Sequence, residues 1–239
     1  IVAQQKNGVV FLNGDMFLPF PNSEILKGKK VCSILALGNN EILFMTDFNG
    51  IFIFDGEKVK PYNTNIDGFI EKNQIFCATI QNNMLAIGTV RGGLVVKNLK
   101  DNSTVYSNIQ TGLQNNTVLS ISFDKIGNIW LGLDKGIDYV MINAPISDLF
   151  GNPGVYGAGY TSLLRSSTLY LGTNQGLFST NYPLSESPEP AAIHLIAGIH
   201  GQVWSLDSIQ NTLFCSSDNG LYTIQNNTVH QISGLNGTW

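Results

Sequence analysis

Residues that could carry catalysis are few and scattered along this 239-residue chain. His194, His200 and His230 lie in three different settings, and no HExxH-type spacing joins them as metal ligands. No G-x-S-x-G motif presents a serine nucleophile. The stretch GVYGAGY (154–160) lacks the strand–turn–helix context of a phosphate-binding loop. The sequence therefore predicts no catalytic residue, no metal site and no cofactor.

Carboxylates recur in short polar turns between apolar runs. Asp47, Asp134 and Asp218 fall at matching places, one or two residues after a position that is mostly small. Two carboxylates brought together could act as an acid–base pair. Repetition at equivalent positions is more typical of turns, because Asp and Asn side chains bond their own backbone there. We interpret these residues as turn residues.

The turns and the connections that follow them predict one polar binding face. In a four-stranded meander, the turn between the second and third strands lies on the same face as the connection into the first strand. The turns bring Asp47, Asn49, Arg91, Asp134, Lys135, Asn174, Gln175, Asp218 and Asn219. The connections bring Asn115, Asn116, Tyr156, Tyr160 and His200. With two cations and several amides, this face suits a neutral or mildly anionic polyol, on which a Tyr ring could stack.

A repeat positions these residues. Gly8, Gly50, Gly92, Gly136, Gly176 and Gly220 each close a polar turn, at intervals of 40 to 44 residues. Three apolar runs of strand length and one poorer run accompany each Gly, without helical periodicity. Four short strands per period of about 40 to 45 residues is typical of a β-propeller blade. A β-solenoid is the alternative, although its coils are usually shorter.

Two columns of small residues agree with crowded inner strands. One column, four residues before each Gly, contains Gln4, Thr46, Gly88, Gly132, Gly172 and Ser216. The other lies in the middle of the first strand, at Ser33, Ala78, Ser120, Ser162 and Ser205. Trp204 begins its strand at the place held by Cys32 and Cys77 in other units, and we expect its ring to be packed. The three Cys lie in apolar runs, which predicts buried thiols and no disulfide framework.

The fold class predicted is all-β, a β-propeller of four-stranded antiparallel blades in a single domain over residues 1–239. Partial blades are expected at 1–22 and 234–239. Full blades are expected at about 30–62, 74–108, 117–143, 159–183 and 201–233. The two ends could meet in a composite sixth blade. We favour a segment of a larger propeller of about seven blades.

Composition excludes several classes of partner. Charged residues make up 13% of the chain and the formal net charge is −4, so a basic nucleic-acid footprint is missing. No apolar run approaches the roughly 18 residues of a membrane span. The chain begins IVAQQKNG, without a signal-peptide pattern, which is consistent with an excised or processed piece.

The stretch SISFDKIGNIWLGLDKGIDYV (120–140) resembles the two-component regulator propeller repeat. Asp124, Gly127, Trp130, Gly132 and Gly136 occupy its pattern, together with the residues beside them. LYLGTNQGLF (169–178), MLAIGTVRGGLVV (84–96) and GLQNNTV (112–118) match parts of it, and ILFMTDFNG (42–50) departs most. The resemblance covers nearly all of the chain. It implies a structural, core role for Trp130.

The resemblance also implies a function. Such propellers form periplasmic sensor parts of membrane-bound regulators in Bacteroidetes, and several respond to carbohydrate breakdown products. We therefore expect a non-catalytic sensor that binds an oligosaccharide, with no direct contact to nucleic acid or membrane. Alternatives are a protein-interaction scaffold, including a homodimer formed through neighbouring regions, and a propeller-type polysaccharide lyase or glycosidase.

Overall fold

The computed structural model describes residues 1–4, 8–144, 153–184, 187, 191–225 and 228–234. The chain divides into two compact units, residues 1–147 (unit 1) and residues 148–239 (unit 2). Both units are built mainly of β-strands, as the composition rich in Gly and poor in charge predicts. No helix in these described ranges has the length and hydropathy needed to cross a membrane.

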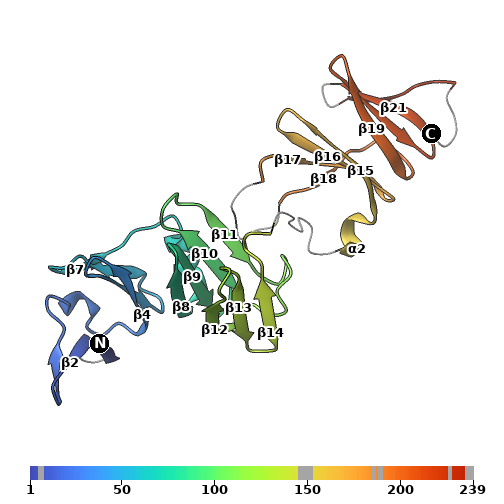
Figure 1. Ribbon diagram of the computed structural model, residues 1–239. Coiled ribbons are helices and arrows are strands. Elements are labelled where there is room, and N and C mark those ends of the chain that lie inside the picture. The colour runs from blue at the N-terminus through green and yellow to red at the C-terminus, as the bar shows by residue number, and fades with distance from the viewer. Residues whose placement is uncertain (5–7, 145–152, 185–186, 188–190, 226–227, 235–239) are drawn as a thin grey trace. The chain divides into compact units, whose positions relative to one another are not determined.

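Unit 1 contains four antiparallel sheets in chain order (Figure 1). The first sheet is β1 (Val2–Gln4), β2 (Gly8–Asn13) and β3 (Met16–Pro19). The second is β4 (Val31–Gly38), β5 (Glu41–Thr46), β6 (Ile51–Phe54) and β7 (Val59–Pro61). The third is β8 (Ile75–Gln81), β9 (Met84–Thr89), β10 (Leu94–Asn98) and β11 (Thr104–Ser107). The fourth is β12 (Val118–Phe123), β13 (Ile129–Leu133) and β14 (Ile137–Val140), and the short helices are η1 (Glu24–Leu26) and α1 (Asp67–Asn73).

Unit 2 contains two four-stranded antiparallel sheets. Helix α2 (Pro153–Tyr156) precedes the first, which is β15 (Gly159–Arg165), β16 (Thr168–Thr173), β17 (Gly176–Asn181) and β18 (His194–Leu195). The second is β19 (Val203–Ile209), β20 (Thr212–Ser217), β21 (Gly220–Gln225) and β22 (Thr228–Gln231).

Every sheet is a meander in which each strand pairs with the next strand along the chain. Successive sheets within a unit pack face to face, which is the arrangement of β-propeller blades. The predicted fold class is therefore confirmed, whereas the single domain over 1–239 and the number of blades in a parent propeller stay predictions. Two details differ. The sheet that begins at Gly159 has its fourth strand at His194–Leu195, beyond the expected end at 183, and the sheet within 117–143 has three described strands.

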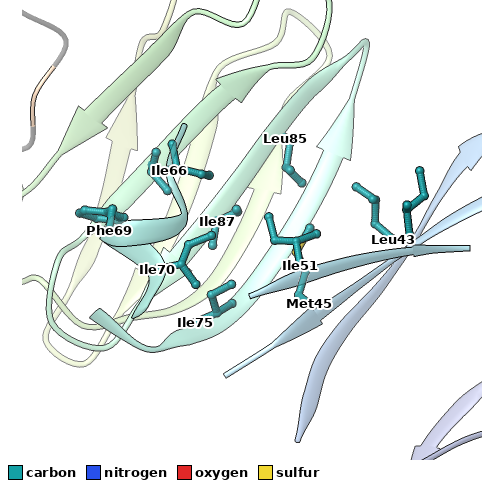
Figure 2. Packing of buried hydrophobic residues seen from close by; sticks show 11 residues of the cluster. Leu43, Met45, Ile51, Ile66, Phe69, Ile70, Ile75, Leu85 and Ile87 are labelled. Carbon is teal, nitrogen blue, oxygen red and sulfur yellow. The ribbon is translucent and has the colours of Figure 1, made fainter. Parts of the chain in front are cut away.

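Apolar side chains from neighbouring sheets interlock between the blades. In unit 1 one cluster joins the sheet of β4–β7 to the sheet of β8–β11, and Figure 2 shows side chains of both sheets together with those of helix α1. Met45 and Ile51 come from one sheet and Ile75 and Ile87 from the other, each at most 3% exposed. Because a single sheet cannot bury both of its faces, this packing between sheets is the main source of stability.

Glycines allow the innermost strands to approach closely. A Cβ on Gly88 would lie 2.6 Å from Val118 Cγ1 of the next sheet and 2.9 Å from Cys77 Sγ of its own sheet. A Cβ on Gly172 would lie 2.5 Å from Val203 Cγ1 of the next sheet. This confirms that the small column marks crowded inner strands. Thr46 was placed in this column wrongly, because Met45 is the residue whose register matches that of Gly88.

The Gly that ends each polar turn has the same left-handed backbone conformation in four-stranded and three-stranded sheets. Gly50, Gly136 and Gly220 have φ values of +81°, +89° and +126°, a left-handed region that favours glycine. In the third sheet the equivalent residue is Gly93, with φ of +80°, and not Gly92 as the sequence suggested. The reason is that this turn has one residue more than the turns of later sheets.

A buried hydroxyl group closes four of these turns. Thr46, Thr89 and Thr173 each donate their hydroxyl hydrogen to the carbonyl oxygen of the turn glycine. The Ser217 hydroxyl lies 3.4 Å from the carbonyl oxygen of Gly220 and closer, at 2.9 Å, to that of His200. Each hydroxyl oxygen also accepts a backbone N–H of the turn. Leu133 occupies this position in β13, so that turn has no such hydroxyl. The repeated hydroxyl holds the turns that carry most of the predicted site residues.

Substitution of Thr89 by valine is expected to lower the free energy of unfolding by roughly 1–3 kcal/mol, because an isosteric apolar side chain leaves buried polar groups unpaired. The hydroxyl is 2.9 Å from both Gly92 N and Gly93 O, and Thr89 is fully buried. Urea unfolding measures the change. Thr79→Val in the same sheet is the control, since Thr79 is half-buried and its hydroxyl makes no hydrogen bond to a residue that the structure describes. Equal stabilities of the two variants would contradict this role of Thr89.

Candidate functional site: an aromatic ledge in unit 2

A β-bulge near the start of the first strand is repeated in five sheets. The pairing register shifts by one residue between Val31 and Ser33 in β4, and at the corresponding place in β8, β12, β15 and β19. The extra residues are Cys32, Phe76, Leu119, Tyr160 and Trp204. A bulge turns its residue away from the regular alternation of a strand. Four of these five side chains are accordingly exposed, by 38% to 45%, although they stand in apolar strands.

In unit 2 the two bulge residues form a stacked aromatic pair. The rings of Tyr160 and Trp204 have centroids 4.6 Å apart and an interplanar angle of 17°. Tyr160 is 44% exposed and Trp204 is 39% exposed, so each ring keeps surface available to a ligand. These residues come from consecutive blades, whose inner strands β15 and β19 lie side by side.

Hydrogen bonds fix the orientation of both rings. The Tyr160 hydroxyl donates to Gln202 Oε1 at 3.2 Å, and Trp204 Nε1 donates to Asp218 Oδ1 at 2.6 Å. Gln202 N donates to Asp218 Oδ2 at 3.2 Å, which joins the two interactions into one network. We call Tyr160, Gln202, Trp204 and Asp218 the aromatic ledge.

The ledge combines a flat apolar surface with donors and acceptors at its rim. Aromatic faces cover the C–H surfaces of sugar rings, and a carboxylate and an amide can bond sugar hydroxyl groups. Asn219 and His200 are exposed residues close in sequence to Asp218 and Gln202. Each of the four ledge side chains already has a partner within the ledge, so its conformation is fixed before a ligand binds. Binding would therefore cost little side-chain conformational entropy.

The remaining predicted residues of unit 2 act mainly in local structure. Asn174 Oδ1 accepts the backbone N–H of Ala158, and the Tyr156 ring packs edge-on against Phe178. Gln175 is an exposed residue of the β16–β17 turn. Of the predicted aromatic pair, Tyr160 therefore lies in the ledge and Tyr156 supports the blade.

The predicted residues of unit 1 lie in equivalent turns and connections. Side-chain oxygens of Asp47, Asn115 and Asn116 accept backbone N–H groups of Phe48, Thr117 and Ile109. Exposed turn residues complete this set: Asn49, Arg91, Asp134 and Lys135. In both units the residue after the second strand donates its N–H to the connection before the first strand, as Asp47 does to Lys30 and Asp218 does to Gln202. Turn and connection therefore lie on one face of each blade, as predicted.

Both expectations about tryptophan were wrong. Trp130 is 49% exposed because it alternates with the buried residues Ile129 and Leu131, and its ring contacts that of Tyr139 in a tilted arrangement, with centroids 4.7 Å apart. Trp204 is exposed because it is the bulge residue. Sequence reasoning also missed Gln202. The register also places Cys77 and Thr161, and not Ala78 and Ser162, at the small position of the first strand. With this correction, the residue just before the small position is aromatic in β8, β15 and β19, which is a signal that the sequence did contain.

The cysteines offer no reactive group to this site. Burial raises the pKa of Cys32 to about 11, and burial raises the pKa of Cys77 and of Cys215 to about 12. No group of three metal-binding side chains is found in the described ranges.

At neutral pH we expect a thiol reagent to react negligibly with the folded protein, because only the thiolate is nucleophilic. After unfolding, all three cysteines should react, since all are free thiols. The absorbance of the group that the reagent releases measures the rate of thiol reaction in the folded and in the unfolded protein. Fast reaction of the folded protein would contradict the burial of these thiols.

No family model and no curated relative matches the chain. Among solved structures it is similar to the extracellular domain of BT4673 from B. thetaiotaomicron, assigned to the hybrid two component systems, with 20% identity, a TM-score of 0.39 and coverage of 87% of this chain and 30% of that chain. The corresponding domain of another such system, BT3049, has 17% sequence identity and a TM-score of 0.40, and the match covers 87% of this chain and 30% of that chain. YCF48 from Cyanidioschyzon merolae has 10% sequence identity and a TM-score of 0.38, and the match covers 94% of this chain and 77% of that chain. The chain spans about three tenths of the length of the two Bacteroides domains.

Proposed function

We propose that this chain is the ligand-binding part of an extracytoplasmic sensor and that the aromatic ledge binds a carbohydrate-derived ligand. The stacked and exposed pair of Tyr160 and Trp204 carries the proposal. In each of these residues the ring is presented to solvent and its polar atom is held by a neighbour. Exposed aromatic surface fixed in this way is typical of recognition sites.

The sensor assignment rests on the resemblance of the repeat to two-component regulator propellers. In this proposal the chain lies in the periplasm, performs no catalysis, and passes on ligand occupancy through neighbouring blades. The ledge favours this function because its two rings come from consecutive blades. A ligand bound there would contact both sheets at once and could stabilise one arrangement of them.

Screening against a panel of oligosaccharides by calorimetry tests the proposal. We expect wild-type protein to bind at least one member, and Tyr160→Ala to weaken that binding by roughly 5- to 150-fold, as the loss of an aromatic contact of about 1–3 kcal/mol implies. Tyr182→Ala is the matched control, because Tyr182 is 46% exposed in the same unit but lies outside the ledge. Equal affinities of the two variants for a confirmed ligand would remove the ledge from consideration.

A second candidate function is protein interaction. The sheet of β12–β14 exposes Trp130, Ile137 and Tyr139 by 41% to 68%, and exposed apolar patches commonly mark interfaces. A homodimer seen by light scattering without ligand, and lost in Ile137→Asp, would favour this function. A monomer at all concentrations would contradict it.

A further inference from the structure

The charge of the ledge identifies the class of sugar that it would accept. Residues 148–239 contain one Lys or Arg residue, Arg165, the three histidines and five acidic residues, so with histidine neutral unit 2 carries the whole net charge of −4. Residues 1–147 are neutral on balance. The two cations expected on the binding face, Arg91 and Lys135, belong to unit 1. The ledge therefore stands in an acidic unit.

The carboxylate of Asp218 has no cationic partner in the described part of unit 2. Asp218 accepts hydrogen bonds from two neutral donors, Trp204 Nε1 at 2.6 Å and Gln202 N at 3.2 Å. The one ion pair among the described residues is Lys60–Asp55, in unit 1. A carboxylate has about four lone-pair positions, so Asp218 keeps acceptor capacity for a ligand. Being half-buried, it is screened by water less than a fully exposed carboxylate.

Arg165 is too distant to neutralise Asp218. It stands at the far end of β15 from Tyr160, and five residues of extended strand separate the two by about 17 Å. Its guanidinium group is also engaged by the backbone oxygen and the side-chain oxygen of Asn211. Since the Debye length is about 8 Å at physiological ionic strength, its field at the ledge is weak.

The Trp204 ring strengthens the preference for a cation. The face of an indole ring attracts ammonium groups within about 6 Å of the centroid. Asp218 Oδ1 sits at the edge of this same ring, bonded to Nε1. A cationic group above the exposed ring surface could therefore meet the ring and the carboxylate together.

We propose that the aromatic ledge selects an amino sugar, whose ring stacks on the exposed face of Trp204 and whose ammonium group pairs with Asp218. This inference rests on the proposed function and narrows it. It differs from the expectation of a neutral or mildly anionic polyol, which counted Arg91 and Lys135 among the binding residues. A uronate would bring a second carboxylate beside Asp218, which opposes binding.

Three oligosaccharides of equal length distinguish the outcomes. Calorimetry would compare a chitosan oligomer, below the pH at which its amines lose their protons, with a chitin oligomer and an oligogalacturonate. We expect the chitosan oligomer to bind about tenfold or more tightly than the chitin oligomer, with an affinity that falls as salt rises. Oligogalacturonate should not bind. In Asp218→Asn, which keeps an oxygen acceptor for Trp204 Nε1, the affinity for the chitosan oligomer should fall by about tenfold or more, and the preference for chitosan over the chitin oligomer should disappear.

Each other result has a definite meaning. If the chitin oligomer binds as tightly as the chitosan oligomer, the amino-sugar inference is overturned while carbohydrate binding stands. If neither binds, the inference fails, and a failure of the whole oligosaccharide panel would overturn the proposed function as well. Oligolysine of matched charge is the control for unspecific attraction. Binding of oligolysine as tight as that of chitosan, or chitosan binding unchanged in Trp204→Ala, would also overturn the inference.

Discussion

Gly172→Ala is expected to lower the free energy of unfolding by about 3 kcal/mol, the upper range for a side chain forced into a packed interior. The added Cβ would lie 2.5 Å from Thr161 Cγ2 and 2.5 Å from Val203 Cγ1. Val203 is fully buried between the two sheets of unit 2, so it has no space to move into. The substitution would therefore push apart the inner strands β15, β16 and β19. Urea unfolding of the purified variant measures the loss.

Gly159→Ala is the matched control for Gly172→Ala. Gly159 lies in the same sheet, and its Cβ would meet no atom within 4 Å. Neither glycine needs a positive φ, so backbone strain does not distinguish the two substitutions. We expect Gly159→Ala to change stability by about 0.5 kcal/mol or less. Similar losses in both variants would contradict the crowding of inner strands that defines the blade.

Trp204→Ala is expected to weaken saccharide binding by roughly 5- to 150-fold, since one stacked ring contributes about 1–3 kcal/mol. The substitution removes the larger ring of the ledge and also releases Asp218 from its bond to Nε1. Tyr160 would lose its stacking partner and keep only its bond to Gln202. Isothermal calorimetry with the ligand found in the panel gives the affinity.

Trp130→Ala is the control for the loss of an exposed tryptophan. Trp130 is 49% exposed and also contacts a tyrosine ring, but it lies in unit 1. Its removal should leave saccharide affinity unchanged. A loss of affinity in Trp130→Ala, with Trp204→Ala unaffected, would move the binding site to the sheet of β12–β14.

The repeat made the architecture predictable. Turn glycines such as Gly50, Gly136 and Gly220 require a backbone conformation that other residues rarely adopt, so their spacing shows in the sequence. The small residues Gly88 and Gly172 could be recognised in the sequence for a similar reason, because steric crowding at these positions excludes larger side chains. The register of Thr46 was misplaced by one residue, since turn length varies between units and a fixed count from the glycine does not follow it.

The site was less predictable because exposure depends on a bulge. In a regular strand, side chains alternate between two faces, and Trp204 would share the face of its neighbours two residues away. One extra residue in β19 changes the direction of the Trp204 side chain, and no residue type by itself predicts where such a bulge occurs. Trp130 was misjudged for another reason, since the repeat pattern fixes a residue type and not which face of the sheet that residue occupies.

The fourth strand of the sheet that begins at Gly159 was also placed wrongly. This strand, β18, follows a long connection after β17, and the length of this connection differs from that in the other blades.

The indole N–H resonances of the tryptophans test the central claim most directly, because Trp204 Nε1 lies at the rim of the ledge and Trp130 lies in the other unit. In a ¹H–¹⁵N correlation spectrum, assigned with Trp204→Phe and Trp130→Phe, an oligosaccharide that binds should shift the Trp204 resonance in a saturable manner. The Trp130 resonance should stay in place. A saturable shift of Trp130 alone, or binding that leaves Trp204 unmoved, would contradict the ledge as the ligand site.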